Sequence, residues 1–136
     1  MKIFIVTLVL LSVMCFSSSY PWKLCPGSDA SRIEVTDVDI DPTPIIKGRA
    51  AKFQTSGNAK QNIYQTNARL DVYQGSTRFF STAVGGSYSV NQGGRYDYSF
   101  SYAIPSFVPP GYYEVRISYV DTSSQAFTCV SVQVRF

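Results

Sequence analysis

The sequence predicts an all-β protein, an immunoglobulin-like sandwich of two antiparallel sheets with about seven strands. Three observations indicate this fold: short runs alternate apolar and polar residues, turn residues separate the runs, and no stretch shows a convincing helical period. One domain is expected, because 136 residues suit a single hydrophobic core. Aromatic residues make up 15% of the chain, mainly 10 Tyr and 9 Phe, so a substantial core can form.

Residues 1–19 have the pattern of a secretory signal peptide. Lys2 gives a positive start, residues 3–14 are almost entirely apolar, and small serines follow shortly before residue 20. A membrane anchor is the alternative, but the apolar stretch is short for a membrane span. We therefore expect a mature domain of residues 20–136 that is secreted or lumenal, with the endosome and lysosome as possible compartments.

Seven runs carry the strand signal, in chain order. They cover residues 33–40, 50–56, 61–73, 77–83, 95–104, 113–119 and 126–136. The first changes its apolar phase between Val35 and Val38, which predicts a bulge. Pro42 and Pro44 end that run, because proline cannot donate to a strand ladder. Glycine-containing turns separate most of the later runs.

The period of two assigns one face of each strand to the core. Phe53 is the main apolar residue of the second run. The third run predicts inward Tyr64, Thr66, Ala68, Leu70 and Val72. The later runs predict inward Tyr96, Tyr98, Phe100 and Tyr102, then Tyr113, Val115, Ile117 and Tyr119, and finally Thr128, Val130, Val132, Val134 and Phe136.

The cysteines predict one disulfide. Cys15 leaves with the signal peptide, and pairing Cys25 with Cys129 leaves no odd thiol in an oxidising compartment. Two free buried thiols are the alternative. The bond closes a loop of about one hundred residues, which the chain-entropy model credits with about 4.7 kcal/mol. It would fasten the start of the domain to its last strand.

Composition argues against several function classes. The mature domain has a net charge near +2, with scattered basic residues, so nucleic acid is not an expected partner. The chain has no histidine, which removes Ser-His-Asp and Cys-His catalysis and the commonest metal ligand. Asp37, Asp39 and Asp41 share one side of a strand, and we interpret them as a solvent-facing edge rather than a calcium site. We expect no metal, no cofactor and no enzymatic activity.

Short motifs at both ends of the mature chain carry a family resemblance. Trp22-x-x-Cys25 precedes a strand that reads Ile-x-Val-x-x-Val-x-Ile and ends in Asp-Pro-x-Pro; Pro109-Pro110-Gly111-Tyr112, Asp121 and Cys129-Val130 follow later. In this order and spacing they resemble the ML-domain family of lipid-recognition domains. That family includes the Niemann–Pick type C cholesterol carrier and the phosphatidylglycerol/phosphatidylinositol transfer proteins. The resemblance covers nearly the whole mature chain.

The resemblance implies a lipid held between splayed sheets. The expected lipid-binding residues are Phe53, Tyr64, Leu70, Val72, Tyr98, Phe100, Tyr102, Val115, Ile117, Tyr119, Val130 and Val132. The sequence lacks the sterol carrier's two extra disulfides and its proline-rich segment after the third strand. Val130 stands where the sterol carrier has an aromatic residue. These departures weaken a sterol assignment and leave a phospholipid more open.

The implied function is a monomeric carrier that transfers phosphatidylglycerol, phosphatidylinositol or sterol between membranes. Phe107 and Val108 stand between prolines, and we interpret them as an exposed membrane-docking pair for transient contact. The alternative for Phe107 is a plug at the end of the core. The alternative for the whole protein is a secreted immunoglobulin-like protein-interaction module without lipid cargo.

Overall fold

The computed structural model describes residues 20–28 and 30–136, and all regular secondary structure in them is β. The predicted signal peptide lies outside the described residues. The strands are β1 (Trp22–Leu24), β2 (Ile33–Asp41), β3 (Ala50–Ala59), β4 (Ile63–Gln74), β5 (Thr77–Val84), β6 (Tyr88–Val90), β7 (Arg95–Ala103), β8 (Tyr112–Asp121) and β9 (Ala126–Arg135). None of the described residues forms a helix long and apolar enough to cross a bilayer.

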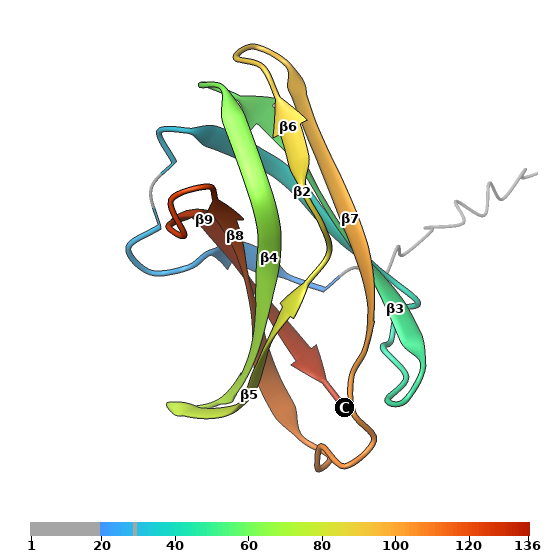
Figure 1. Ribbon diagram of the computed structural model, residues 1–136. Helices are drawn as coiled ribbons and strands as arrows, with labels where there is room; N and C mark the ends of the chain where they lie inside the picture. The colour runs from blue at the N-terminus through green and yellow to red at the C-terminus, as the bar shows by residue number, and fades with distance from the viewer. Residues whose placement is uncertain (1–19, 29) are drawn as a thin grey trace, which may run out of the picture.

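The strands form two antiparallel sheets that face each other (Figure 1). The larger sheet has the order β1-β9-β8-β4-β5, and β6 pairs with the first part of β4. The smaller sheet has the order β2-β3-β7. The predicted sandwich is therefore confirmed. All seven predicted strands are present, and the structure adds the three-residue strands β1 and β6.

The core lies between the sheets and follows the period of two. In β7, Tyr96, Tyr98 and Phe100 are buried while the residues between them are exposed. In β8, Tyr113, Val115, Ile117 and Tyr119 are buried, as predicted. These side chains meet those of β2, β3, β4 and β9 in one hydrophobic cluster. Each Å² of buried apolar surface contributes about 25 cal/mol to the free energy of folding, so this cluster is the main source of stability.

Two irregularities change the side that strand residues face. The predicted bulge in β2 is confirmed, because its register with β3 shifts between Val35 and Asp37. Gly57 lies opposite Val35, and a Cβ there would collide with the backbone of Glu34. The glycine therefore allows the bulged strand to approach β3 closely.

A second shift lies in β4, between Gln65 and Asn67, in its register with β8. It places Ile63 and Gln65 inward and leaves Tyr64 54% exposed on the outer face. The prediction that Tyr64 and Thr66 face the core is therefore wrong. A uniform period of two does not hold through a strand that contains a bulge, because a shift of one residue exchanges the two faces of the strand.

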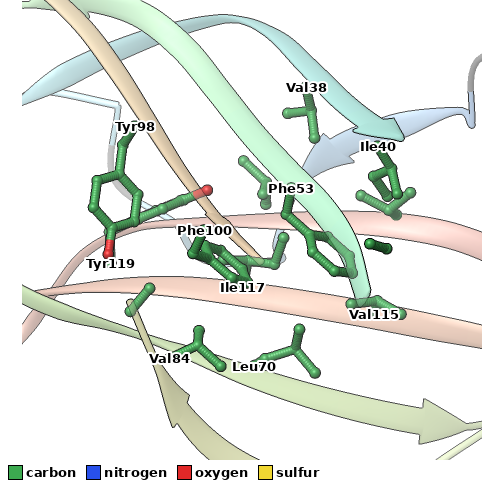
Figure 2. Packing of buried hydrophobic residues seen from close by; sticks show 14 of the residues in the cluster. Val38, Ile40, Phe53, Leu70, Val84, Tyr98, Phe100, Val115, Ile117 and Tyr119 are labelled. Carbon is green, nitrogen blue, oxygen red and sulfur yellow. The ribbon is translucent and has the colours of Figure 1, made fainter. Parts of the chain in front are cut away.

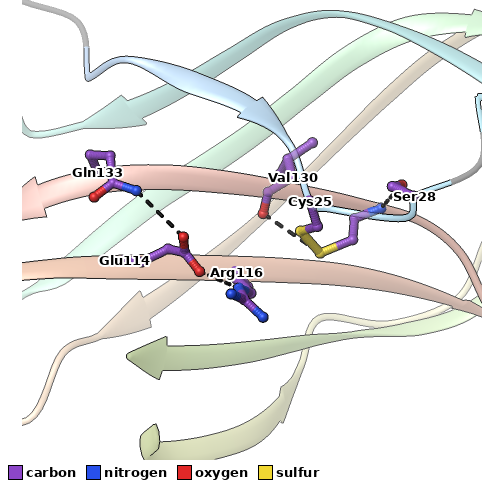
Figure 3. Close-up of a disulfide and its surroundings, with 7 residues drawn as sticks. Cys25, Ser28, Glu114, Arg116, Val130 and Gln133 are labelled. Carbon is purple, nitrogen blue, oxygen red and sulfur yellow. Dashed lines mark hydrogen bonds and ion pairs between the residues drawn. A yellow bond between two sulfur atoms is a disulfide. The ribbon is translucent and has the colours of Figure 1, made fainter. Parts of the chain in front are cut away.

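The disulfide between Cys25 and Cys129 is confirmed (Figure 3). Its Cα atoms are 5.3 Å apart, and the Cys25 amide donates to the Cys129 carbonyl over 3.0 Å. β1 pairs with β9 just before this bond, so ladder and disulfide fasten the same segment. Such a bond belongs in an oxidising compartment.

Candidate functional site

Most of the predicted lipid-binding side chains lie together between the sheets. Tyr102 is half-buried and Tyr64 lies outside the core. The other members are buried: Phe53, Leu70, Val72, Tyr98, Phe100, Val115, Ile117, Tyr119, Val130 and Val132. In this structure they pack against one another, so the sheets are closed over the predicted site.

The loop end of the sandwich is the end at which residues 42–49 join β2 to β3, residues 75–76 join β4 to β5, and residues 104–111 join β7 to β8. The C-terminus lies at the same end (Figure 1). The core nearest to it is aliphatic and aromatic. The rings of Phe53 and Phe100 stack with centroids 5.2 Å apart. They face Leu70, Val115 and Ile117 of the larger sheet (Figure 2).

The opposite end, which we call the tyrosine end, joins the sheets through polar contacts. The Tyr119 hydroxyl of β8 is hydrogen-bonded to the Thr55 hydroxyl of β3. The Tyr96 hydroxyl of β7 donates to Gln65 Oε1 of β4. The Tyr119 ring lies 5.9 Å from Tyr96 and 6.0 Å from Tyr98, in edge-to-face contacts. Burial raises the pKa of both Tyr96 and Tyr119 above the ordinary phenol value.

Two further contacts hold the tyrosine end closed. The Tyr98 hydroxyl donates to the Gly86 carbonyl over 3.0 Å and accepts from the Gly86 amide over 2.9 Å. Gly85 has φ +69, and a Cβ there would collide with that hydroxyl. Arg32, just before β2, pairs with Asp121 of β8 over 2.8 Å. Hydrogen bonds from Ser123 and Arg32 hold the pKa of Asp121 below its ordinary value.

The two ends therefore differ in how their sheets are joined. Both hydrogen bonds between side chains of facing strands in residues 20–28 and 30–136 lie at the tyrosine end. Near the loop end the facing side chains meet through apolar contacts alone. Apolar contacts are non-directional, so this half can accept another apolar group more easily than the tyrosine end.

The loop end also carries exposed apolar side chains. Phe107 is 74% exposed, which argues against the alternative that it plugs the core. Val108 is 1% exposed, so its prediction as a docking residue is wrong. The Val108 carbonyl accepts from Lys47 Nζ over 2.7 Å, which fixes the proline-rich loop against residues 42–49. Ile46, Phe79 and Tyr112 are the other exposed large apolar residues at this end.

The outer surface of the described residues is hollowed at places bordered by polar and charged side chains. Two hollows of about 370 and 460 Å³ lie on the outer face of the larger sheet. The first adjoins the disulfide and is bordered by Asp71, Tyr73 and Arg116, the last with its guanidinium 4.4 Å from the Tyr73 ring. Figure 3 shows Arg116 paired with Glu114 on this face. No cluster of three potential metal-ligating side chains occurs in the part of the chain that the structure describes.

The polar contacts of the tyrosine end were not predicted. Gln65 was assigned to the outer face because a polar residue in an alternating strand normally faces solvent. Its inward position follows from the β4 register shift. A signal was available in the sequence, since Ile63 is apolar and out of phase with Leu70 and Val72.

Fold and interior together define a small β-sandwich protein whose apolar core is tied by hydrogen bonds near one end. The sequence profile that describes the ML domain matches residues 19–136. The chain therefore belongs to the ML-domain family, and the predicted membership is confirmed.

Named relatives are similar over most of the chain. A phosphatidylglycerol/phosphatidylinositol transfer protein of Pyricularia oryzae is 27% identical over 126 residues, which span 85% of this chain and 71% of the relative. A Dictyostelium discoideum protein, provisionally named as a transfer protein for the same two lipids, is 25% identical over 122 residues. That alignment spans 82% of this chain and 79% of the relative.

Solved structures share the fold at low sequence identity. A Niemann-Pick type C2 protein from the Japanese carpenter ant superposes with a TM-score of 0.61 at 12% identity, over 85% of this chain and 98% of that one. Chicken MD-1, crystallised with lipid IVa, gives a TM-score of 0.55 at 13% identity, over 85% and 88% of the two chains. Both confirm the two-sheet sandwich.

Proposed function

We propose that this protein is a secreted or lumenal lipid carrier that binds one phospholipid between its sheets and transfers it between membranes. The observation that carries the proposal is the asymmetric core, hydrogen-bonded across the sheets at the tyrosine end and purely apolar near the loop end. Membership of the ML-domain family supports it. The relatives named for phosphatidylglycerol and phosphatidylinositol favour those lipids over sterol as cargo.

The proposed pocket forms when the sheets separate at the loop end while the tyrosine end stays joined. An acyl chain then lies between Phe53 and Phe100 of the smaller sheet and Val115 and Ile117 of the larger sheet. It replaces the contacts that these side chains make with one another in the closed structure. Each buried methylene contributes about 0.8 kcal/mol. A long chain contributes on the order of 10 kcal/mol before ordering costs are subtracted. The headgroup remains at the loop end, in contact with water.

The same end is suited to transient membrane contact. Phe107 and Ile46 present exposed apolar side chains, and Lys47 and Arg49 stand beside them in residues 42–49. Basic residues near an anionic bilayer contribute about 1 kcal/mol each. Docking by this end places the proposed pocket mouth against the bilayer, so a lipid moves between membrane and pocket without crossing water.

A vesicle transfer assay tests the function. Donor vesicles contain fluorescent phosphatidylglycerol or phosphatidylinositol, acceptor vesicles contain phosphatidylcholine alone, and the purified mature protein is added in catalytic amounts. We expect transfer that rises in proportion to protein concentration. If the lipid stays in the donor vesicles at every protein concentration, the carrier function is contradicted and an interaction module becomes the better interpretation.

A further inference from the structure

The tyrosine end contains hydrogen-bonding groups that the fold leaves without partners. We infer that these groups select a lipid whose buried part carries a hydroxyl or carbonyl group far from its headgroup. The inference rests on the proposed function, because it concerns the interior end of the same pocket. It adds a polar contact at a point where an ordinary acyl chain offers only methyl and methylene groups.

Gln65 provides the first group. Its side chain is 2% exposed and points between the sheets from β4. Its Oε1 atom accepts a hydrogen bond from the Tyr96 hydroxyl, which fixes the orientation of the amide. Its Nε2 atom is buried and has no hydrogen-bond partner. Gln65 therefore presents an oriented donor to the interior.

Thr128 provides the second group. It is 3% exposed and lies directly opposite Tyr119 in the β8–β9 ladder, so both side chains stand on the inner face. Its Oγ1 atom has no hydrogen-bond partner. The Tyr119 hydroxyl is already engaged by Thr55. Ser131 also has a buried unpartnered hydroxyl, but it alternates with Val130 and Val132 and therefore lies on the other face of β9.

These unpartnered groups are costly unless something pairs with them. A buried donor without an acceptor forfeits the hydrogen bonds it would make in water. A plain acyl chain cannot pair with Gln65 Nε2 or Thr128 Oγ1, whereas a hydroxyl or carbonyl on the chain can. Because Thr55–Tyr119 and Tyr96–Gln65 keep this end joined, Gln65 on β4 and Thr128 on β9 stay on either side of β8, where a polar atom at the end of an inserted chain can pair with one or the other.

A competition experiment tests the inference. The mature protein is incubated with vesicles containing equal amounts of two phosphatidylglycerols that differ only in a terminal hydroxyl on one acyl chain. Native mass spectrometry then counts the two complexes. One hydrogen bond to an otherwise unpaired group corresponds to roughly a three- to tenfold preference, so we expect the hydroxylated lipid to dominate by that factor.

Two variants assign the preference to its residues. Thr128→Val keeps the shape of the side chain, and Gln65→Leu removes the oriented donor together with the acceptor of the Tyr96 hydroxyl. Each is expected to reduce the preference, and uptake of the plain lipid is measured in parallel to separate lost selectivity from lost binding. Thr66→Val, on the outer face of β4, is the matched control and should keep the wild-type ratio. If Gln65→Leu fails to fold, the preference measured with Thr128→Val tests the inference alone.

The outcomes separate this inference from the function on which it rests. Equal uptake of both lipids by the wild type overturns the polar-end selectivity and leaves the carrier function standing. A preference that survives in Thr128→Val and Gln65→Leu also overturns it. Uptake of neither lipid contradicts both.

Discussion

At the scale of single residues, the tyrosines of the interior stabilise the fold in two ways. Their rings fill the core, and their hydroxyls hydrogen-bond across the sandwich or to a turn. Tyr98 reaches Gly86, and Tyr119 reaches Thr55. A buried phenol requires such a partner, so these residues specify how the sheets meet at that end.

The buried phenols predict alkaline sensitivity. An unfolded tyrosine loses its proton near pH 10, whereas burial raises the pKa of Tyr96 and Tyr119 in the folded state. The unfolded state then binds fewer protons, so stability falls as pH rises above about 10, by about 1.4 kcal/mol per pH unit for each phenol. Tyr119→Phe should remove one such contribution. Denaturant titrations between pH 8 and pH 11 measure the slope, and an unchanged slope in the variant contradicts the assignment.

The alternation of apolar and polar residues predicts the inward or outward side of most strand residues, but not of all. The inward residues of β7 and β8 were predicted correctly, because strict alternation of aromatic and polar residues leaves one arrangement that buries the apolar face. Tyr64 and Val108 were misplaced. Tyr64 faces outward because the β4 register shift exchanges the two faces of the strand. Val108 turns inward from the proline-rich loop, and that position depends on tertiary contacts that alternation does not encode.

At the scale of elements, β9 is fastened to the N-terminal segment twice. β1 pairs with it through Trp22, Lys23 and Leu24, and the disulfide follows at Cys25. The disulfide was predictable from cysteine counting. β1 was not, because three residues between a tyrosine–proline pair and a cysteine are too few to show a period.

Loss of the disulfide is expected to destabilise the domain. Cys129→Ala should lower the free energy of unfolding by about 2–5 kcal/mol, because the unfolded chain regains the freedom of a long loop. Thermal melts of the variant and of the reduced wild type measure the effect. Cys25→Ala is the matched control and should behave alike. Melts that stay unchanged after reduction would show that the bond contributes nothing.

The inner face of β8 provides the direct test of where the lipid sits. Ile117→Trp adds bulk between the sheets, where overpacking costs about 1–3 kcal/mol, so a fold of ordinary stability should survive. We expect lipid uptake to be lost in a vesicle-binding assay. Tyr64→Trp, on the outer face of β4, should leave uptake unchanged. Normal uptake by a folded Ile117→Trp variant would place the lipid elsewhere.

The two strand irregularities, in β2 and β4, differ in how far the sequence predicts them. The β2 bulge was predictable because apolar residues lie on both sides of the phase change, from Val35 to Val38. The β4 shift was missed because it falls where the inward residue is Gln65. A polar residue at an inward position obscures the shift in the apolar pattern of the strand. Gln65 is tolerated in the core because its Oε1 atom accepts a hydrogen bond from the Tyr96 hydroxyl.

At the scale of the whole molecule, the sandwich has a polar, joined end and an apolar end with exposed side chains. Phe107 is the most exposed of the large apolar residues described. It stands on the loop that Lys47 holds against residues 42–49. On this arrangement we base the proposal that membrane contact and cargo exchange take place at one end of the carrier.

Membrane docking is testable separately from cargo binding. Phe107→Ser should slow lipid transfer between anionic vesicles severalfold, because an apolar anchor is lost, while the lipid already bound is retained. Ser106→Ala in the same loop serves as the control. Transfer rates and native masses are measured in parallel. A transfer rate equal to that of the wild type would remove Phe107 from the docking surface.

The central claim is that one lipid occupies the space between the sheets, and native mass spectrometry of the purified protein tests it most directly. Bound material is released, extracted and identified. We expect a one-to-one complex with a phospholipid, from which extraction recovers phosphatidylglycerol or phosphatidylinositol. A lipid-free mass that remains lipid-free after incubation with liposomes of these lipids would contradict the claim.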